Sequence, residues 1–406
     1  MKTDPINAAC VALLFAAIAF GTCTPLHAAP QGDLGGFGDP IAGQRLFVQK
    51  NCVRCHAVRG ADGTSAPDLG RKNIGTSFHA IAASMWSHSP GMTAKMSEYR
   101  IPHPQFADDE FADLVSFLYF LNYFDEPGDP REGKVLFTEK HCVRCHKVGQ
   151  EGGTTGPALD DIPRDTSPLQ LAAALWNHGP AMVDSIKEAG LEVPQFAGSQ
   201  SLDLFAFVRS HGRRTTAPRF QSPGDAAKGE LVFEDKGCSM CHPLFGDEPG
   251  TGPDLGRIEL RGTVTQIAGQ MWNHWPEMHR VMKRAGMSVP QFQDDELKDL
   301  FAYVYIARYR GEPGDAERGR AVFQGKGCSI CHGNDGEGRI GPALRDITVG
   351  MSREKITQAM WNHAPRMHEK LGDQNLSWAQ LGANELADLL CFLSTGLKPV
   401  PDPSGK

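Results

Sequence analysis

Hydrophobic and polar positions along the chain follow a pattern that occurs four times. Each copy opens with Gly-x-x-x-Phe, a four-residue spacing that places the glycine and the aromatic residue on one face of a helix. Each copy ends in an amphipathic stretch, Asp-Leu-x-x-aromatic-aliphatic, at residues 113–118, 203–208, 299–304 and 388–393. Because a glycine on the first helix lets another helix cross closely, we expect the first and last helices of each unit to pack together beside their aromatic residues.

The repeat divides the chain into four predicted helical domains. The opening residues are Gly43 and Phe47, Gly133 and Phe137, Gly229 and Phe233, and Gly319 and Phe323, each Phe being followed by a Lys at the third position. Pro-Gly-Asp turns separate the copies, and a longer basic connector interrupts them at the midpoint, where we expect a hinge. The predicted fold is all-α, with domains at residues 39–126, 128–210, 224–312 and 314–398, and a linker at 211–223.

Five residues after each Phe begins a Cys-x-x-Cys-His motif, and the four motifs start 90, 96 and 90 residues apart. At this spacing two thiols capture the vinyl groups of a haem and the next residue ligates its iron. A zinc site needs four ligands per ion, and a thioredoxin-type pair lies beside a βαβ unit; neither predicts a His after every second Cys. The prediction is four haem c groups attached through Cys52, Cys55, Cys142, Cys145, Cys238, Cys241, Cys328 and Cys331, with His56, His146, His242 and His332 as iron ligands.

A haem also explains how units of about 90 residues can be stable. Each unit is small for a self-sufficient hydrophobic core, and a large apolar cofactor can supply the centre of the domain. Iron held in a protein sheath stores one electron, so the first function to expect is electron transfer. Cys391, outside the motifs, falls in an apolar helical stretch and is expected to be a small core residue.

The N-terminus reads as a signal peptide. It has Lys2, an apolar stretch at residues 8–21, and a small-residue region that places cleavage near Ala28, so residues 1–28 are expected to be removed during export. The predicted location is therefore periplasmic or extracellular. The formal net charge of −7 argues against nucleic-acid binding and favours docking onto a basic patch of a redox partner, an interaction that salt should weaken.

These features together resemble class I c-type cytochromes, and the resemblance covers each unit from end to end. The family has a first helix with a Gly and an aromatic residue, Cys-x-x-Cys-His, a Gly-Pro-x-Leu loop and an aromatic C-terminal helix. The loop reads Ala66-Pro67-Asp68-Leu69, Gly156-Pro157-Ala158-Leu159, Gly252-Pro253-Asp254-Leu255 and Gly341-Pro342-Ala343-Leu344. In the family the Pro carbonyl accepts the second ring proton of the ligand histidine, which fixes the ring.

The sixth iron ligand is open between two residue types in a repeated Trp-x-His-x-Pro-x-Met motif. Class I cytochromes usually place a Met shortly before the last helix, but the corresponding positions here are Ile101-Pro102, Val193-Pro194, Val289-Pro290 and Leu376-Ser377. The Pro two residues after each His suits the start of a new helix, so we expect the His to cap one helix and the Met to open the next. We favour Met92, Met182, Met278 and Met367 as ligands; the alternatives are His88, His178, His274 and His363, or an open site.

The ligand matters because a thioether raises the haem potential, whereas a second imidazole lowers it. The main hypothesis is an exported tetrahaem cytochrome, not an enzyme, that transfers electrons one at a time between donor and acceptor redox proteins, with a membrane oxidoreductase among the candidate partners. A peroxidase or multihaem reductase with one open haem is the alternative from another class, although four similar ligand patterns argue against one specialised haem. A further alternative is a subunit of a membrane respiratory complex or of a conductive assembly.

Overall fold

The computed structural model describes residues 37–397 apart from 64, 72–74, 122, 124, 215–223, 247, 259 and 261. The predicted signal peptide and most of the basic linker lie outside these residues. Within the described part of the chain, no helix combines the length and the apolar character needed to cross a membrane.

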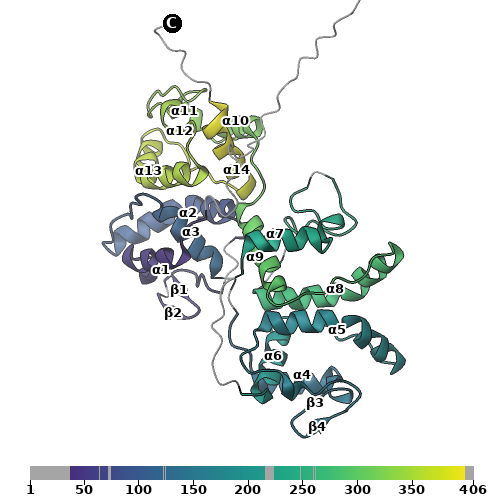
Figure 1. Cartoon of the computed structure of the whole chain (residues 1–406). Helices are drawn as coiled ribbons and strands as arrows, with labels where there is room; N and C mark the ends of the chain where they lie inside the picture. Colours follow the sequence, from purple (N-terminus) through teal and green to yellow (C-terminus); the bar gives the residue numbers. More distant parts are fainter. Residues whose placement is uncertain are drawn as a thin grey trace, which may run out of the picture.

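Each unit consists of a first helix, a Cys-containing turn, a long helix and a last helix (Figure 1). The first helices are α1 (Pro40–Gln49), α4 (Pro130–Glu139), α7 (Ala226–Asp235) and α10 (Ala316–Gly325). The long helices are α2 (Phe78–Glu98), α5 (Pro168–Glu188), α8 (Val264–Arg284) and α13 (Arg353–Asp373). The last helices are α3 (Glu110–Phe120), α6 (Gln200–His211), α9 (Glu296–Arg310) and α14 (Ala383–Cys391), which continues into the π-helical turn η5 (Phe392–Gly396).

Short elements complete the units. The Cys-containing turns are η1 (Cys52–Arg54), η2 (Cys142–Arg144), η4 (Cys238–Met240) and α11 (Cys328–His332). Domains 1 and 2 add two-residue antiparallel hairpins, formed by β1 (Ala57–Val58) with β2 (Ala61–Asp62), and by β3 (Lys147–Val148) with β4 (Glu151–Gly152). Single turns η3 (Leu159–Asp161) and α12 (Arg345–Thr348) lie before the long helices of domains 2 and 4. The predicted all-α fold with four tandem domains is confirmed.

The first and last helices of each domain cross at the predicted glycine. A Cβ atom on Gly43 would overlap the carbonyl group of Asp113, so only glycine allows the two backbones to approach this closely. Beside this crossing, Phe47 and Phe117 lie with ring centroids 5.5 Å apart. The other domains repeat the arrangement with Phe137 and Phe207, Phe233 and Tyr303, and Phe323 and Phe392.

Two repeated polar residues tie the same helices together. The Asp that begins the last-helix motif accepts the backbone N–H of the residue that caps the first helix, as Asp113 does from Asp39 at 2.8 Å. The Lys three residues after the motif Phe donates to a carbonyl just before the last helix, as Lys50 does to Gln105 at 2.8 Å. Equivalent Lys bonds are made by Lys140, Lys236 and Lys326. These charged residues therefore have structural roles.

The long helices do not break at their internal proline, so the predicted helix end between His and Met is wrong. Each long helix runs for 21 residues through Pro90, Pro180, Pro276 or Pro365. A proline inside a helix removes one hydrogen bond, to the carbonyl four residues earlier, and packing of the helix against its neighbours can compensate for that loss. The carbonyl left without its helical donor is in each case that of the motif Trp.

The domains pair out of sequence order, which the sequence did not indicate. In domain 1, α2 packs against α13 and α14 of domain 4, and α5 of domain 2 packs against α8 of domain 3 (Figure 1). Two hydrophobic cores follow this division, one formed mainly by domains 1 and 4 and the other mainly by domains 2 and 3. We call these units pair 1/4 and pair 2/3.

The last helix of domain 3 joins the two pairs. Its side chains Tyr305 and Tyr309 are buried in the core of pair 1/4. The hydroxyl of Tyr119 donates to the Tyr305 carbonyl at 2.7 Å, and the hydroxyl of Tyr305 donates back to the Tyr119 carbonyl at 3.0 Å. Tyr309 lies 3.1 Å from the Ser116 hydroxyl. Domains 1 and 3 therefore make the junction, and the spatial sequence of domains is 4, 1, 3, 2.

Candidate haem sites

Each Cys pair lies on a tight turn directly after the first helix. The residue before the first Cys has a left-handed backbone, with φ of 66° at Asn51 and 62° at His141, and glycine at Gly237 and Gly327. This reversal starts the turn, and the backbone N–H of His56 then closes it by donating to the Cys52 carbonyl at 3.0 Å. All eight motif cysteines are half-buried. Both sulfurs of a pair are thus presented from one turn at the surface of the helical core.

Burial keeps the first thiol of each pair protonated. It raises the pKa of Cys52, Cys142, Cys238 and Cys328 to about 11. A reactive redox dithiol needs a lowered thiol pKa instead. Among the described residues, no group of three or more His, Cys, Asp or Glu side chains is arranged to hold a metal ion. Neither alternative chemistry of the Cys pair therefore finds support in its surroundings.

The His of each motif is oriented by the loop proline, as the family resemblance implies. Nδ1 of His56 lies 3.0 Å from the Pro67 carbonyl oxygen. The same bond is 2.9 Å for His146 and Pro157, and 3.0 Å for His242 with Pro253 and for His332 with Pro342. A carbonyl can only accept, so Nδ1 carries the proton and Nε2 is left with the lone pair that an iron ligand needs.

The residue before the loop proline packs against the histidine ring. A Cβ on Gly156 would come within 2.6 Å of His146 Cε1, and similar overlaps would arise at Gly252 and Gly341. Domain 1 has Ala66 at this position. The bond from His56 to Pro67 nevertheless has nearly the same length as in the other domains, at 3.0 Å.

The Trp of the repeated Trp-x-His-x-Pro-x-Met motif acts between domains. Trp176 Nε1 donates to the Pro290 carbonyl of domain 3 at 2.8 Å, and Trp272 Nε1 donates to the Pro194 carbonyl of domain 2 at 2.8 Å. In pair 1/4, Trp86 bonds Ala379 and Trp361 bonds Pro104, both at 2.9 Å. We call the reciprocal contacts made by each Trp and the residue after it (86–87, 176–177, 272–273 and 361–362) the clasp. These residues hold domains together and are not haem ligands.

The two candidate sixth ligands have different surroundings. The four candidate histidines are exposed, and each places Nδ1 2.8 Å from a carbonyl of its own helix, as His88 does with Ser84. The four candidate methionines are half-buried, and Met92, Met182 and Met278 pack against the hydrophobic cores. The assignment of Met92, Met182, Met278 and Met367 stays a prediction, because the histidine bonds use Nδ1 and leave Nε2 free.

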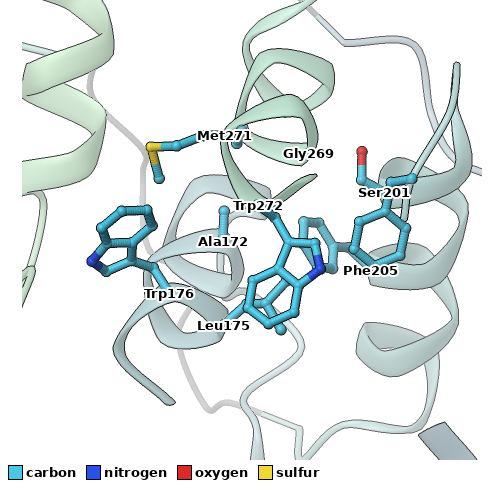
Figure 2. Close-up of a pocket in the computed structure, with 10 residues that line it drawn as sticks. Ala172, Leu175, Trp176, Ser201, Phe205, Gly269, Met271 and Trp272 are labelled. Carbon is cyan, nitrogen blue, oxygen red and sulfur yellow. The ribbon is translucent and has the colours of Figure 1, made fainter. Parts of the chain in front are cut away.

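A second methionine position lies on the long helices, seven residues before the first. It holds Met85, Leu175, Met271 and Met360. Met271 lines a cavity of about 10 Å³ at the clasp of pair 2/3, together with Trp176, Leu175 and Trp272 (Figure 2). Because Met271 faces the partner domain and domain 2 has Leu at the same position, this position serves the interface. It offers matched control variants for the ligand position.

The residues of each site fit a covalently bound haem c. Two adjacent thiols are available for thioether bonds, one imidazole is fixed with Nε2 free, and a small residue leaves room beside the ring in three of the four domains. When bound, a haem would supply an iron that exchanges one electron. The Cys pair would hold the porphyrin, and the loop proline carbonyl orients the imidazole that would ligate the iron.

This fold and this donor set define class I c-type cytochrome domains, repeated four times. The family model for cytochrome c matches residues 41–121, 130–211, 226–305 and 316–396. The chain is also 34% identical over 102 residues to a cytochrome c-553-like protein of Synechocystis sp., covering 24% of this chain and 87% of that protein. No solved structure matches the chain significantly.

The chain belongs to the cytochrome c family. Its domains imply covalently bound haem c, and four domains with four Cys pairs are consistent with four haems. The family supports a multihaem electron-transfer function. What sequence reasoning missed is the clasp, and the only signal for it was a Trp that recurred in every unit without any role at the haem.

Proposed function

We propose that this protein is an exported tetrahaem cytochrome that carries electrons one at a time between redox proteins. The observation that carries the proposal is the fourfold repetition of one arrangement, a Cys pair followed by a His whose Nδ1 is held by a proline carbonyl. Four equivalent arrangements suit a relay, in which each centre performs the same step. A catalytic haem would be expected to differ from the other three.

The proposed sixth ligands are Met92, Met182, Met278 and Met367. Each lies on the second half of a long helix beyond the internal proline and is half-buried. The competing histidines are exposed. Their bond to the helix uses Nδ1 and leaves Nε2 with its lone pair, so that bond does not decide between the two residue types. Thioether ligation would make all four haems relatively high-potential carriers.

Electrons would follow the spatial arrangement of the domains and not their sequence order. Exchange within pairs 1/4 and 2/3 is favoured by the shared cores. Crossing between the pairs is expected between domains 1 and 3, where Tyr119 and Tyr305 exchange hydrogen bonds. Domains 4 and 2 then lie at the two ends of the relay and are the proposed entry and exit points.

The ligand proposal is tested by replacing one methionine at a time in the haem-loaded protein. Met278→Leu should remove about a quarter of the weak long-wavelength charge-transfer absorption that a methionine sulfur gives to ferric haem, because one of four haems loses its ligand. Met271→Leu, on the same helix, is the matched control and should leave the band at full strength. Four Met→Leu variants with unchanged spectra would transfer the assignment to His88, His178, His274 and His363.

The choice between carrier and enzyme depends on whether any iron has an exchangeable position. The reduced wild-type protein should bind carbon monoxide slowly or not at all at every haem if all four are six-coordinate. Fast, stoichiometric binding at one haem would favour a peroxidase or reductase. Export is tested separately by comparing the cellular fraction that contains the full chain with that of a variant lacking residues 2–28.

A further inference from the structure

The clasp is nearly the same in all four domains and so does not by itself determine which domains pair. Every domain offers an indole N–H and accepts another through a carbonyl two residues before an aromatic or leucine side chain. Three of the four domains follow the Trp with an Asn, which bonds the backbone of the partner. Another feature must distinguish the correct partners.

One position beside the clasp differs in every domain. It is the residue between His and Pro in the motif, which is Ser89, Gly179, Trp275 and Ala364 in domains 1 to 4. All four residues are buried, and Trp275 is completely buried, at 0% exposure. The position therefore lies inside the packed region and carries a side chain that ranges from a hydrogen atom to an indole.

Gly179 and Trp275 lie directly against each other across pair 2/3. A Cβ placed on Gly179 would come within 2.7 Å of both Cε2 and Nε1 of Trp275. Carbon atoms do not approach this closely, so any side chain larger than hydrogen at position 179 would have to displace the indole. The two positions thus form a complementary contact of a large and a very small residue.

The equivalent positions of pair 1/4 are both small. Ser89 is 2% exposed and Ala364 is 1% exposed, so both side chains are buried. Each carries the Cβ atom that the Trp275 indole cannot tolerate at position 179. If domain 3 were placed against domain 1, domain 4 or the domain 3 of a second copy, the Trp275 indole would therefore meet a side chain at the position where only glycine leaves room for it.

The indole of Trp275 contributes by packing and not by hydrogen bonding. Its Nε1–H is buried and has no hydrogen-bond partner among the residues that the structure describes, which costs stability. The ring stacks on His279 of its own helix, with centroids 4.6 Å apart and planes at 26°, and this contact fixes its direction. The space that the indole fills against domain 2 explains why a Trp occupies this position although its N–H makes no hydrogen bond within the described part of the chain.

We propose that Trp275 and Gly179 form a lock that selects domain 2 as the partner of domain 3. The lock prevents domain 3 from pairing with domains 1 or 4 of its own chain, or with domain 3 of a second copy. Pair 1/4 is then the combination left to the remaining two domains. The inference concerns domain assembly and does not depend on the electron-transfer proposal.

The test uses the full-length, haem-loaded protein and amide hydrogen exchange resolved by helix. Gly179→Ala should speed exchange in α5 and α8 by about tenfold or more and leave α2 and α13 within about twofold, since only pair 2/3 loses its fit. Gly91→Ala is the matched control, because nothing lies within 4 Å of a Cβ at that helical position. It should leave exchange unchanged in all four helices.

Coupling between the two positions separates a specific lock from general fragility. Gly179→Ala should have no further effect in a Trp275→Ala background, and the exchanged pair Gly179→Trp with Trp275→Gly should return exchange to within about threefold of wild type. Trp275→Ala alone should also increase the fraction of higher-mass species in solution. Additive effects of the two Ala variants, or an exchanged pair no better than the worse single variant, would overturn the proposal.

Discussion

Pair 2/3 and pair 1/4 share one clasp and complete it with different chemistry. In pair 2/3 both sides are alike: Asn177 bonds the backbone of Phe292, and Asn273 bonds the backbone of Phe196, through N–H and C=O in each case. In pair 1/4, Asn362 makes this double contact with Phe106, and on the other side the shorter Ser87 hydroxyl bonds both backbone groups of Leu381. Shape distinguishes the first pair, and polar side chains distinguish the second.

The difference centres on the carbonyls that the helix prolines leave without a helical donor. In pair 1/4, His103 Nε2 lies 3.2 Å from the Trp361 carbonyl, and Trp378 Nε1 donates to the Trp86 carbonyl at 3.0 Å. The His103 ring also stacks on Trp361, and the Trp378 ring lies tilted against Trp86 with centroids 4.3 Å apart. The carbonyls that accept the clasp indoles set the register, which differs by two residues from the sequence alignment of Ile101 and Leu376 with Val193 and Val289. In this register the corresponding residues of pair 2/3 are Val193 and Val289. The same internal proline thus creates an acceptor that one pair uses for recognition between domains.

The largest expected effect comes from removing a clasp indole of pair 2/3. Trp272→Ala loses a side chain that is 2% exposed and its bond to Pro194, so we expect pair 2/3 to lose about 3–5 kcal/mol. Hydrogen exchange resolved by helix should show the loss in α5 and α8 and not in α13. Trp378→Ala is the comparison in pair 1/4, where the Trp378 ring is only half-buried. A loss of stability as large as that of Trp272→Ala would mean that the two pairs do not differ as described.

Acid should weaken pair 1/4 more than pair 2/3. Burial and the positive charge of Arg353 lower the pKa of His79 to about 3. Arg353 is itself paired with Glu354, and Gly311 of domain 3 packs against the ring. Unfolded His79 binds a proton near its ordinary pKa of about 6.5, so stability falls as the pH drops below that value, by up to roughly 4 kcal/mol near pH 3–4. Partial burial also lowers the pKa of His103, which adds in the same direction.

The residues at the position of His79 in pair 2/3 provide the control. They are Leu169 and Thr265, which do not titrate. His79→Leu should therefore flatten the dependence of the α2 and α13 exchange free energies on pH between about 6.5 and 4. Equal acid sensitivity of both pairs, unchanged by His79→Leu, would attribute the acid effect to carboxylates in general.

Features set by short-range spacing could be predicted from the sequence. The glycine crossing at Gly43, the Cys turn at Cys52 and the bond from His56 to Pro67 all depend on residues within one repeat, and each is present. The proline at position 90 was interpreted by a local rule as a helix start. That interpretation failed because packing between domains stabilises a helix that the local rule would end.

The arrangement of the domains could not be predicted for a different reason. A motif that recurs identically in four units carries no information about which unit meets which. The information lies in the residues that break the repeat, such as Trp275 opposite Gly179 and His103 where the other pair has Val. Deviations from the repeat looked like neutral variation in the sequence, and only their positions in space show that they are complementary.

A smaller effect is expected when the polar contact of pair 1/4 is replaced by the residue of pair 2/3. His103→Val removes the bond to the Trp361 carbonyl and the stacking on Trp361, whose ring centroid is 4.9 Å away. The expected loss is about 1–2 kcal/mol, seen as faster exchange in α13. Val193→His in domain 2 is the reciprocal control. If Val193→His speeds exchange in α8 as much as His103→Val speeds exchange in α13, both effects would come from altered packing and not from the lost hydrogen bond.

The smallest effect is expected when pair 2/3 is given the asymmetry of pair 1/4. Asn177→Ser reproduces the residue of domain 1 and removes the bonds that the Asn amide makes to both backbone groups of Phe292, each 2.7–2.8 Å long. A shorter hydroxyl can replace part of this contact, as Ser87 does with Leu381, so the expected loss is about 1 kcal/mol. Ser87→Asn in domain 1 should give a gain no larger than this loss if the clasp is one module used twice. A loss of stability from Ser87→Asn would instead mean that the symmetric clasp no longer fits this side of pair 1/4. Trp378 and Gln380, which bond the same helix turn, would then be the cause of the difference.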